Sequence, residues 1–405
     1  ILKGQPGTEV KLTVKRYGKD NTEVVTFKRE EVKVKSVPYS GMLSNGIAYV
    51  RLTQFTDQCG REVEDALRNL KASNEIKGVV LDLRGNPGGL LNEAVNVSNI
   101  FIDKGQLIVS TKGRIEEWDK SFSTLNQPFD TQIPVAVLVN SGSASASEIV
   151  SGSLQDLDRG IVVGQKTFGK GLVQTTRPLS YGTQLKVTTA HYYTPSGRCI
   201  QALDYAHRNE DGSVGKIPDS LKKTFKTKAG RTVTDGGGVE PDVALEQHKY
   251  APIIVSLAEK NLIFDYANLY ASKHPTIPEV SAFALTEADY TEFTKWLSNK
   301  EYDYTTKTEE QLKTFEKTAE NEEYYDALKA DLASLRTKMA HDKDRDLLKH
   351  KDEIKKLLSE EIVARYYYQT GRVQMSLKND KEVDKAIEVL TNPSEYKKLL
   401  ATNVK

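Results

Sequence analysis

The chain has 405 residues, of which 38% are hydrophobic and 28% are charged, and its formal net charge at pH 7 is +1. This length predicts two or three domains, and the near-neutral charge argues against a nucleic-acid partner. The sequence contains no run of about 18 apolar residues, so it predicts no membrane span. The first residues, Ile1 to Gly4, show no targeting pattern, so we expect either a removed leader or a start inside the mature protein.

Residues 1–38 predict β structure. Apolar residues alternate with polar ones from Val10 to Val14, a turn follows at residues 17–20, and a second apolar stretch runs on to Val37. Two or three antiparallel strands of this length make a poor domain alone. We therefore interpret them as the last part of a domain whose beginning is missing.

Residues 46–165 alternate between apolar strands and helices. The expected strands are Ile47–Leu52, Val79–Leu83, Val135–Val139 and Ile161–Val163, and the expected helices are a stripe from Val63 to Leu70, Leu90–Ile102 and Ser147–Leu157. Such a pattern predicts an α/β layer whose sheet is buried on both faces. The strand signal returns between residues 172 and 248, where the charged stretch 208–231 predicts a surface loop or a β excursion.

After Tyr250 the composition changes to Lys, Glu, Leu and Ala, with helical spacing such as Ile354, Leu358 and Ile362. This pattern predicts a separate helical module. The expected domains are a β segment over residues 1–38, an α/β core over 39–250 and a helical domain over 251–405.

A run of small and hydroxyl residues, 140–148 (NSGSASASE), joins the strand Val135–Val139 to the next helix. A serine hydroxyl there lies beside the unpaired amides and the positive end of the helix, where an oxyanion is stabilised as it forms. The plainer interpretation is helix capping, which Ser147 followed by Glu148 fits. Spacing alone does not say which serine would react.

The loop after the last of these strands, residues 164–174 (GQKTFGKGLVQ), places Lys170 between two glycines and near apolar residues. A lysine kept from water has a lowered pKa, and a lysine general base needs a pKa of roughly 7 to 8. Its amine could then take the proton of Ser145, as in Ser-Lys variants of the serine-hydrolase scheme. Gln174 could orient the amine by accepting a hydrogen bond, whereas the plainer interpretation is an exposed turn lysine.

The same loop matches Gly-x-x-x-x-Gly-Lys, the phosphate-binding pattern of nucleotide hydrolases. That pattern requires Ser or Thr next and then a helix. Here Gly171 follows, and residues 172–176 predict a strand. Nucleotide binding is therefore the weaker alternative.

A third loop, residues 82–89 (DLRGNPGG), follows the strand Val79–Leu83. Its glycines let backbone amides face a substrate, and the Gly88 amide could form an oxyanion hole with the Ala146 amide. The plainer interpretation is a tight turn in which Arg84 is tied to Asp82 or to a nearby carbonyl.

Histidine, metal and thiol chemistry have little support in the sequence. Of the six histidines only His191 lies in a core-like strand, and we interpret it as a packed or surface residue. Cys59 and Cys199 lie far apart without metal-ligand spacing, and both a disulfide and two free thiols stay open. We expect no metal and no organic cofactor.

These three loops, in this order, resemble the signature blocks of the carboxyl-terminal processing peptidases, also called tail-specific proteases. Residues 193–198 (YTPSGR) and 238–242 (GVEPD) resemble two further blocks, although Cys199 stands where serine is usual. The similarity covers roughly residues 1–248. It implies a ClpP/crotonase-like α/β protease core. The opening β segment over residues 1–38, with residues 2–8 (LKGQPGT), resembles the closing strands of the family's PDZ domain.

The resemblance also implies site residues. The family has a Ser-Lys dyad, often completed by a glutamine. Its nucleophile maps to Ser145, its lysine to Lys170 at the family's spacing, and its glutamine to Gln174. The resemblance thus chooses among serines that spacing could not separate.

We therefore expect a serine endopeptidase that cleaves protein or peptide substrates near exposed carboxyl termini through an acyl-enzyme, in the periplasm or cell envelope. The helical domain could form a homodimer or bind an adaptor protein. The first half of the PDZ domain is missing, so substrate capture could be impaired. The alternative from another class is a non-catalytic peptide-binding scaffold with the protease fold.

Overall fold

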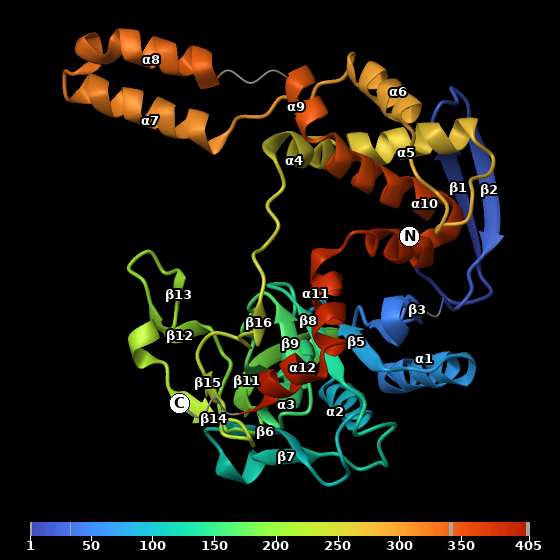
Figure 1. Cartoon of the computed structure of the whole chain (residues 1–405), viewed down its shortest axis with the longest axis vertical. Coiled ribbons are helices and arrows are strands. Elements are labelled where there is room, and N and C mark those ends of the chain that lie inside the picture. Colours follow the sequence, from blue (N-terminus) through green and yellow to red (C-terminus); the bar gives the residue numbers. More distant parts are fainter. Residues whose placement is uncertain (1, 33, 340–342, 402–405) are drawn as a thin grey trace. The chain divides into compact units, whose positions relative to one another are not determined.

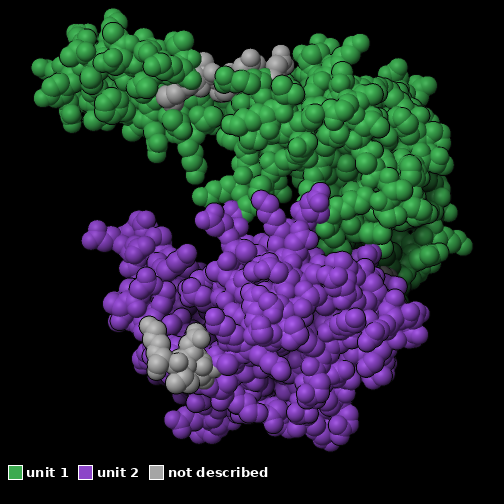
Figure 2. Space-filling model, in the orientation of Figure 1, with its two compact units in different colours: residues 1–32, 248–378 green, residues 33–247, 379–405 purple. Residues whose placement is uncertain are grey.

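The structure is a computed structural model that describes residues 2–32, 34–339 and 343–401. The chain divides into two compact units (Figure 1, Figure 2). The sheet unit contains residues 33–247 and 379–405, and the helical unit contains residues 1–32 and 248–378.

The sheet unit is built on a six-stranded sheet in the order β16-β9-β8-β5-β4-β3. Its strands are β3 (Tyr39–Met42), β4 (Ile47–Arg51), β5 (Gly78–Asp82), β8 (Val135–Val139), β9 (Ile161–Gly164) and β16 (Val243–Ala244). All pairs are parallel except β3 with β4. Every residue of β5, β8 and β9 is buried, which confirms the predicted sheet covered on both faces.

Helices from the first part of the chain cover one face of this sheet. They are α1 (Cys59–Ser73), α2 (Leu91–Asn99) and α3 (Ala146–Asp156). Alternate strand residues such as Val50, Leu81 and Val137 pack with them in one continuous core.

The last part of the chain covers the other face. The helices α11 (Lys381–Leu390) and α12 (Pro393–Leu400) return to the sheet unit and contact β5, β8 and β9 (Figure 1). Strand residues of opposite parity, such as Val80 and Leu138, are also fully buried and lie outside the first core. Residues 379–401 therefore belong with the sheet, whereas the sequence assigned them to the helical domain.

A second, four-stranded sheet in the sheet unit has the order β10-β11-β6-β7. Its strands are β6 (Leu107–Gly113), β7 (Lys120–Ser123), β10 (Leu172–Pro178) and β11 (Gln184–Tyr193). The stretch that predicted a loop or a β excursion forms two hairpins, made of β12 (Leu203–Arg208) with β13 (Val214–Lys216) and β14 (Thr224–Lys226) with β15 (Thr232–Thr234).

The helical unit contains one antiparallel pair, β1 (Glu9–Lys15) with β2 (Thr22–Lys28), and seven described helices. The helices are α4 (Pro252–Glu259), α5 (Leu262–Lys273), α6 (Glu287–Leu297), α7 (Lys307–Asn321), α8 (Tyr325–Met339), α9 (Lys343–Lys349) and α10 (Lys351–Ser376). Of the two or three strands expected in residues 1–38, β1 and β2 form in the described residues, and the side chains of Val32 and Val34 are exposed.

Both cysteines are free, and Cys59 is buried, so the open question of a disulfide is answered. Within the part of the chain that the structure describes, no helix is long and apolar enough to cross a membrane. The same residues contain no cluster of three or more His, Cys, Asp or Glu side chains suited to a metal ion.

Candidate active site

Ser145 lies between the carboxyl end of β8 and the first turn of α3, at the N-cap of that helix. Its backbone has φ 57° and ψ −113°, a conformation that a residue with a side chain rarely adopts. Ser147, which fitted the cap in the sequence, lies inside the helix instead. Its hydroxyl donates to the carbonyl of Asn86 at 2.9 Å.

The glycine turn after β5 lies directly against Ser145. Gly88 has φ 97°, and a Cβ atom there would lie 2.6 Å from the Ala144 carbonyl oxygen and 2.8 Å from the Ala146 nitrogen. Only glycine fits such a close approach. The predicted neighbours Gly88 and Ala146 are thus in contact.

The amides of this turn differ in their partners. The Gly88 N–H donates to Oδ1 of buried Asn86 at 2.9 Å. Within the described residues, neither the Ala146 N–H nor the Gly89 N–H has a hydrogen-bond partner. The unpaired Ala146 amide, at the positive end of α3, is suited to bind an oxyanion.

Lys170 lies in the loop between β9 and β10, as the sequence predicted. The loop touches the serine run, because the Phe168 N–H donates to the Ser143 carbonyl at 3.0 Å. The Lys170 side chain is half-buried. Within the residues that the structure describes, no hydrogen bond joins its amine to the Ser145 hydroxyl.

A buried carboxylate joins the serine and lysine segments. Glu148 Oε2 accepts the Ser145 N–H at 2.8 Å and the Lys170 N–H at 2.9 Å. Its Oε1 accepts the Gly169 N–H at 2.7 Å and the Thr167 hydroxyl at 2.6 Å. Burial raises the pKa of Glu148, although these hydrogen bonds oppose the rise.

Tyr192 reaches the same place from β11. Its buried hydroxyl donates to the Lys170 carbonyl. Burial raises the pKa of Tyr192 well above its ordinary value and the Glu148 carboxylate adds to the rise, while a hydrogen bond with the Ser145 side chain opposes it. The sequence alone does not predict this role of Tyr192, because a single tyrosine in an alternating strand carries no local signal of the contact.

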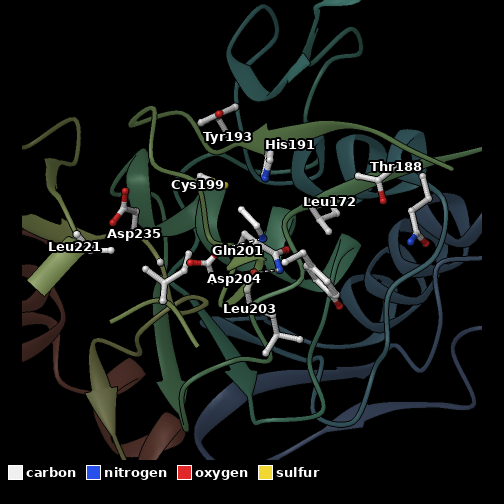
Figure 3. A pocket seen from close by; sticks show the side chains of 15 residues that line it. Leu172, Thr188, His191, Tyr193, Cys199, Gln201, Leu203, Asp204, Leu221 and Asp235 are labelled. Atoms are coloured by element: carbon white, nitrogen blue, oxygen red, sulfur yellow. Dashed lines mark hydrogen bonds between the residues drawn. The ribbon is translucent and has the colours of Figure 1, made fainter. Parts of the chain in front are cut away.

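Gln174 lies elsewhere. It is exposed on β10 and, with Leu172, lines a cavity of about 610 Å³ next to β11 (Figure 3). His191 and Tyr193 also line this cavity, whereas Tyr192 between them points into the core. Because neighbouring strand residues face opposite sides, the cavity lies on the other side of the sheet from the Ser145 contact. Within the described chain, no hydrogen bond joins Gln174 to the Lys170 amine.

The loop around Lys170 leads into strand β10 rather than a helix. The phosphate-binding alternative therefore lacks the helix N-terminus that it requires. The exposed position of His191 agrees with its interpretation as a surface residue.

Arg84 has a partner set that the sequence predicted only in part. Its guanidinium bonds Asp82 at 2.6 Å and also pairs with Asp380 at 2.9 Å and Glu382 at 2.6 Å at the start of α11. Burial favours a protonated Asp82, but Arg84 and Arg51 outweigh it and hold the pKa of Asp82 well below its ordinary value. Glu382 also accepts a hydrogen bond from Gln165, at the start of the Lys170 loop.

The chain matches two family models. Residues 46–206 match the family model described as "Peptidase family S41", and residues 253–390 match "Probable PDZ-protease, C-terminal helical domain". The resemblance stated from the sequence is thus confirmed, together with a mixed α/β peptidase fold and a helical domain after it.

Two bacterial proteases are among the curated relatives. The chain is 42% identical over 205 residues to a carboxy-terminal-processing protease of Bartonella bacilliformis, covering 50% of this chain and 46% of the relative. It is 44% identical over 202 residues to a probable CtpA-like serine protease of Staphylococcus aureus (strain N315), covering 49% and 39%. The chain thus spans less than half the length of these relatives.

Among solved structures, the chain is similar to the photosystem II D1 C-terminal processing protease. The match has 28% identity, covers 60% of this chain and 57% of the other, and has a TM-score of 0.39.

Proposed function

We propose that this protein is a serine endopeptidase with Ser145 as nucleophile and Lys170 as general base, because residues 46–206 match the peptidase family S41 model and the geometry of the two loops supports this chemistry. One observation carries the proposal: a single oxygen of Glu148 accepts the backbone N–H of both residues. Their backbones therefore meet at one atom. The lysine has a flexible four-carbon stem, so its amine can reach the serine hydroxyl by side-chain rotation.

In the proposed reaction, the neutral Lys170 amine takes the proton of Ser145 as the hydroxyl oxygen attacks the substrate carbonyl. The Ala146 N–H stabilises the oxyanion. The Gly88 N–H can also donate to the oxyanion once its hydrogen bond to Asn86 Oδ1 is broken. The protonated lysine then gives its proton to the leaving amine, and the same lysine deprotonates the water that hydrolyses the acyl-enzyme.

The finer features of the proposal come from the resemblance. We propose a ClpP/crotonase-like core, a partial PDZ segment within residues 1–38, and substrates with exposed carboxyl-terminal segments. Gln174 would orient the Lys170 amine after moving from its exposed position on β10. A periplasmic or envelope location and a homodimer or adaptor contact through the helical domain are proposed on the same ground.

The test is peptide hydrolysis by Ser145→Ala and Lys170→Ala. We expect each to lower kcat/KM at least about 1,000-fold, because each removes a group that takes part in the chemistry. Ser141→Ala and Lys166→Ala are matched controls from the same two loops. Ser141 is exposed, and Lys166 makes only a rim ion pair of 3.5 Å with Glu240.

Full activity of either dyad variant would refute the dyad. A non-catalytic scaffold predicts a different result, namely that neither the wild type nor any variant hydrolyses the peptide. Covalent labelling by a fluorophosphonate separates the two cases. It should modify the wild type at Ser145 and leave the Ser145→Ala variant unlabelled.

A further inference from the structure

We propose that Glu148 is a positioning residue of the proposed peptidase site: by accepting the backbone N–H groups of Ser145 and Lys170, it fixes the position of these two residues relative to each other. The inference rests on the proposed function and adds a residue to it. Glu148 is fully buried and lies in the first turn of α3.

The two carboxylate oxygens have distinct partners. Oε2 binds the N–H groups of Ser145 and Lys170, and Oε1 binds the N–H of Gly169 and the hydroxyl of Thr167. A carboxylate offers about four acceptor sites, and all four are used. The side chain therefore connects the start of α3 with the loop after β9.

Ordinary helix capping does not account for this set. An acidic residue at the third helical position commonly bonds back to the N-cap N–H, and that explains only the contact with Ser145. The other three bonds go to residues 167–170, which belong to a different element. The contacts thus serve the junction of two loops and not the helix alone.

Every partner of Glu148 is a donor. Three are backbone N–H groups, and the Thr167 oxygen already accepts the Val239 N–H at 2.7 Å, so its own proton points to Glu148. Only an ionised carboxylate accepts all four. Within the described residues no Lys, Arg or His forms an ion pair with it, and the titratable side chain that interacts with it is Tyr192.

A buried carboxylate without a cation is costly, and here its hydrogen bonds constrain the nucleophile. Ser145 is held at φ 57°, and Glu148 fixes its N–H. Without that bond, the serine backbone can relax toward a commoner conformation and carry the hydroxyl away. A displacement of about 1 Å at a reacting group costs roughly 100-fold in rate.

The first experiment compares Glu148→Gln with Glu93→Gln. Glutamine has one acceptor oxygen, so two of the four donors lose their partner. We expect kcat of Glu148→Gln to fall about 100-fold while KM stays within about threefold, and Glu148→Asp, which keeps the charge, to recover part of the loss. Glu93 is a buried carboxylate of the same unit that accepts the Gly60 N–H at 2.7 Å, and its variant should keep both constants.

A second readout does not depend on turnover. Amide hydrogen exchange should become faster in residues 143–149 and 165–171 of Glu148→Gln, and should stay unchanged there in Glu93→Gln and Lys170→Ala. Unchanged exchange in both segments, or a kcat within threefold of the wild type, would overturn the positioning role. Failure of the dyad itself is seen separately, as full activity of Ser145→Ala.

Discussion

The backbone of Ser145 combines φ 57° with a side chain that must face a substrate. Such a conformation costs a residue with a Cβ about 1 to 3 kcal/mol, whereas glycine adopts it freely at an entropic cost of about 0.5 to 1 kcal/mol. We therefore expect Ser145→Gly to be more stable than Ser145→Ala by about 1 kcal/mol. Urea unfolding at constant m-value measures the difference, and equal stabilities would show that the site carries no such strain.

The charge of Glu148 predicts a pH dependence. Burial raises its pKa above the ordinary 4.5, so the folded protein keeps a proton that the unfolded chain has already lost. Stability is therefore lost as pH rises from about 4.5 through the raised pKa. Glutamine does not titrate, so the wild type should lose stability relative to Glu148→Gln across this window. Unfolding free energies measured at several pH values check the sign, and a difference independent of pH would contradict it.

At this scale the sequence predicted which loops meet but not how. The three loops that contain Gly88, Ser145 with Ala146, and Lys170 have recognisable sequence motifs, and the structure brings these loops together. The Tyr192 contact depends on the register of β11, which no local pattern encodes. Gln174 stays a prediction, since its role requires a conformation other than the exposed one described here.

Among the elements, α11 joins both loops of the site. Asp380 and Glu382 at the start of α11 pair with Arg84, which lies in the same loop as Gly88. Glu382 also accepts a hydrogen bond from Gln165 in the Lys170 loop. The Arg84 side chain is only 13% exposed. Removing one member of a buried ion network costs about 3 kcal/mol or more, because the partner charges stay buried.

Arg84→Met should therefore lower the free energy of unfolding by about 3 kcal/mol. Arg68→Met, which breaks an exposed pair with Glu64 on α1, should change it by about 0.5 kcal/mol or less. Denaturant titration of the two variants tests the contrast. Similar small losses for both would mean that the Arg84 network contributes little.

Four of the six strands of the main sheet were predictable because continuous apolar runs mark them, and Val135–Val139 matches β8 at both ends. The short edge strands β3 and β16 carry no such run and were not predicted. The return of residues 379–401 to this sheet was not predicted either. Their Lys- and Glu-rich helical pattern is the same as that of the preceding helices, and amphipathicity says that a face is buried without saying against what.

For the whole molecule, the sheet and helical units each draw on two separate stretches of chain. Lys249 lies in an exposed, irregular segment at the start of the second stretch of the helical unit. A cut after Lys249 leaves one fragment with β1, β2 and most of the sheet unit, and another with α4 to α12. Because α11 and α12 pack on the sheet, we expect the two fragments to elute together in native buffer and to separate in urea.

Limited trypsin digestion followed by size-exclusion chromatography provides the measurement. Fragments that part in native buffer would show that the packing of α11 and α12 is too weak to hold them. Deleting residues 379–401 before digestion is the control, and it should favour separation.

This arrangement also affects biosynthesis. A ribosome makes the strands of the sheet early, yet the helices that bury one of its faces emerge only after the whole helical unit. Until then, apolar residues such as Val80 and Leu138 have no cover on that side, and Arg84 has Asp82 beside it but not yet Asp380 and Glu382. The sheet of the nascent chain therefore keeps one apolar face uncovered until residues 379–401 have been made, so a polypeptide interrupted within the helical region would lack both this cover and the α11 partners of Arg84.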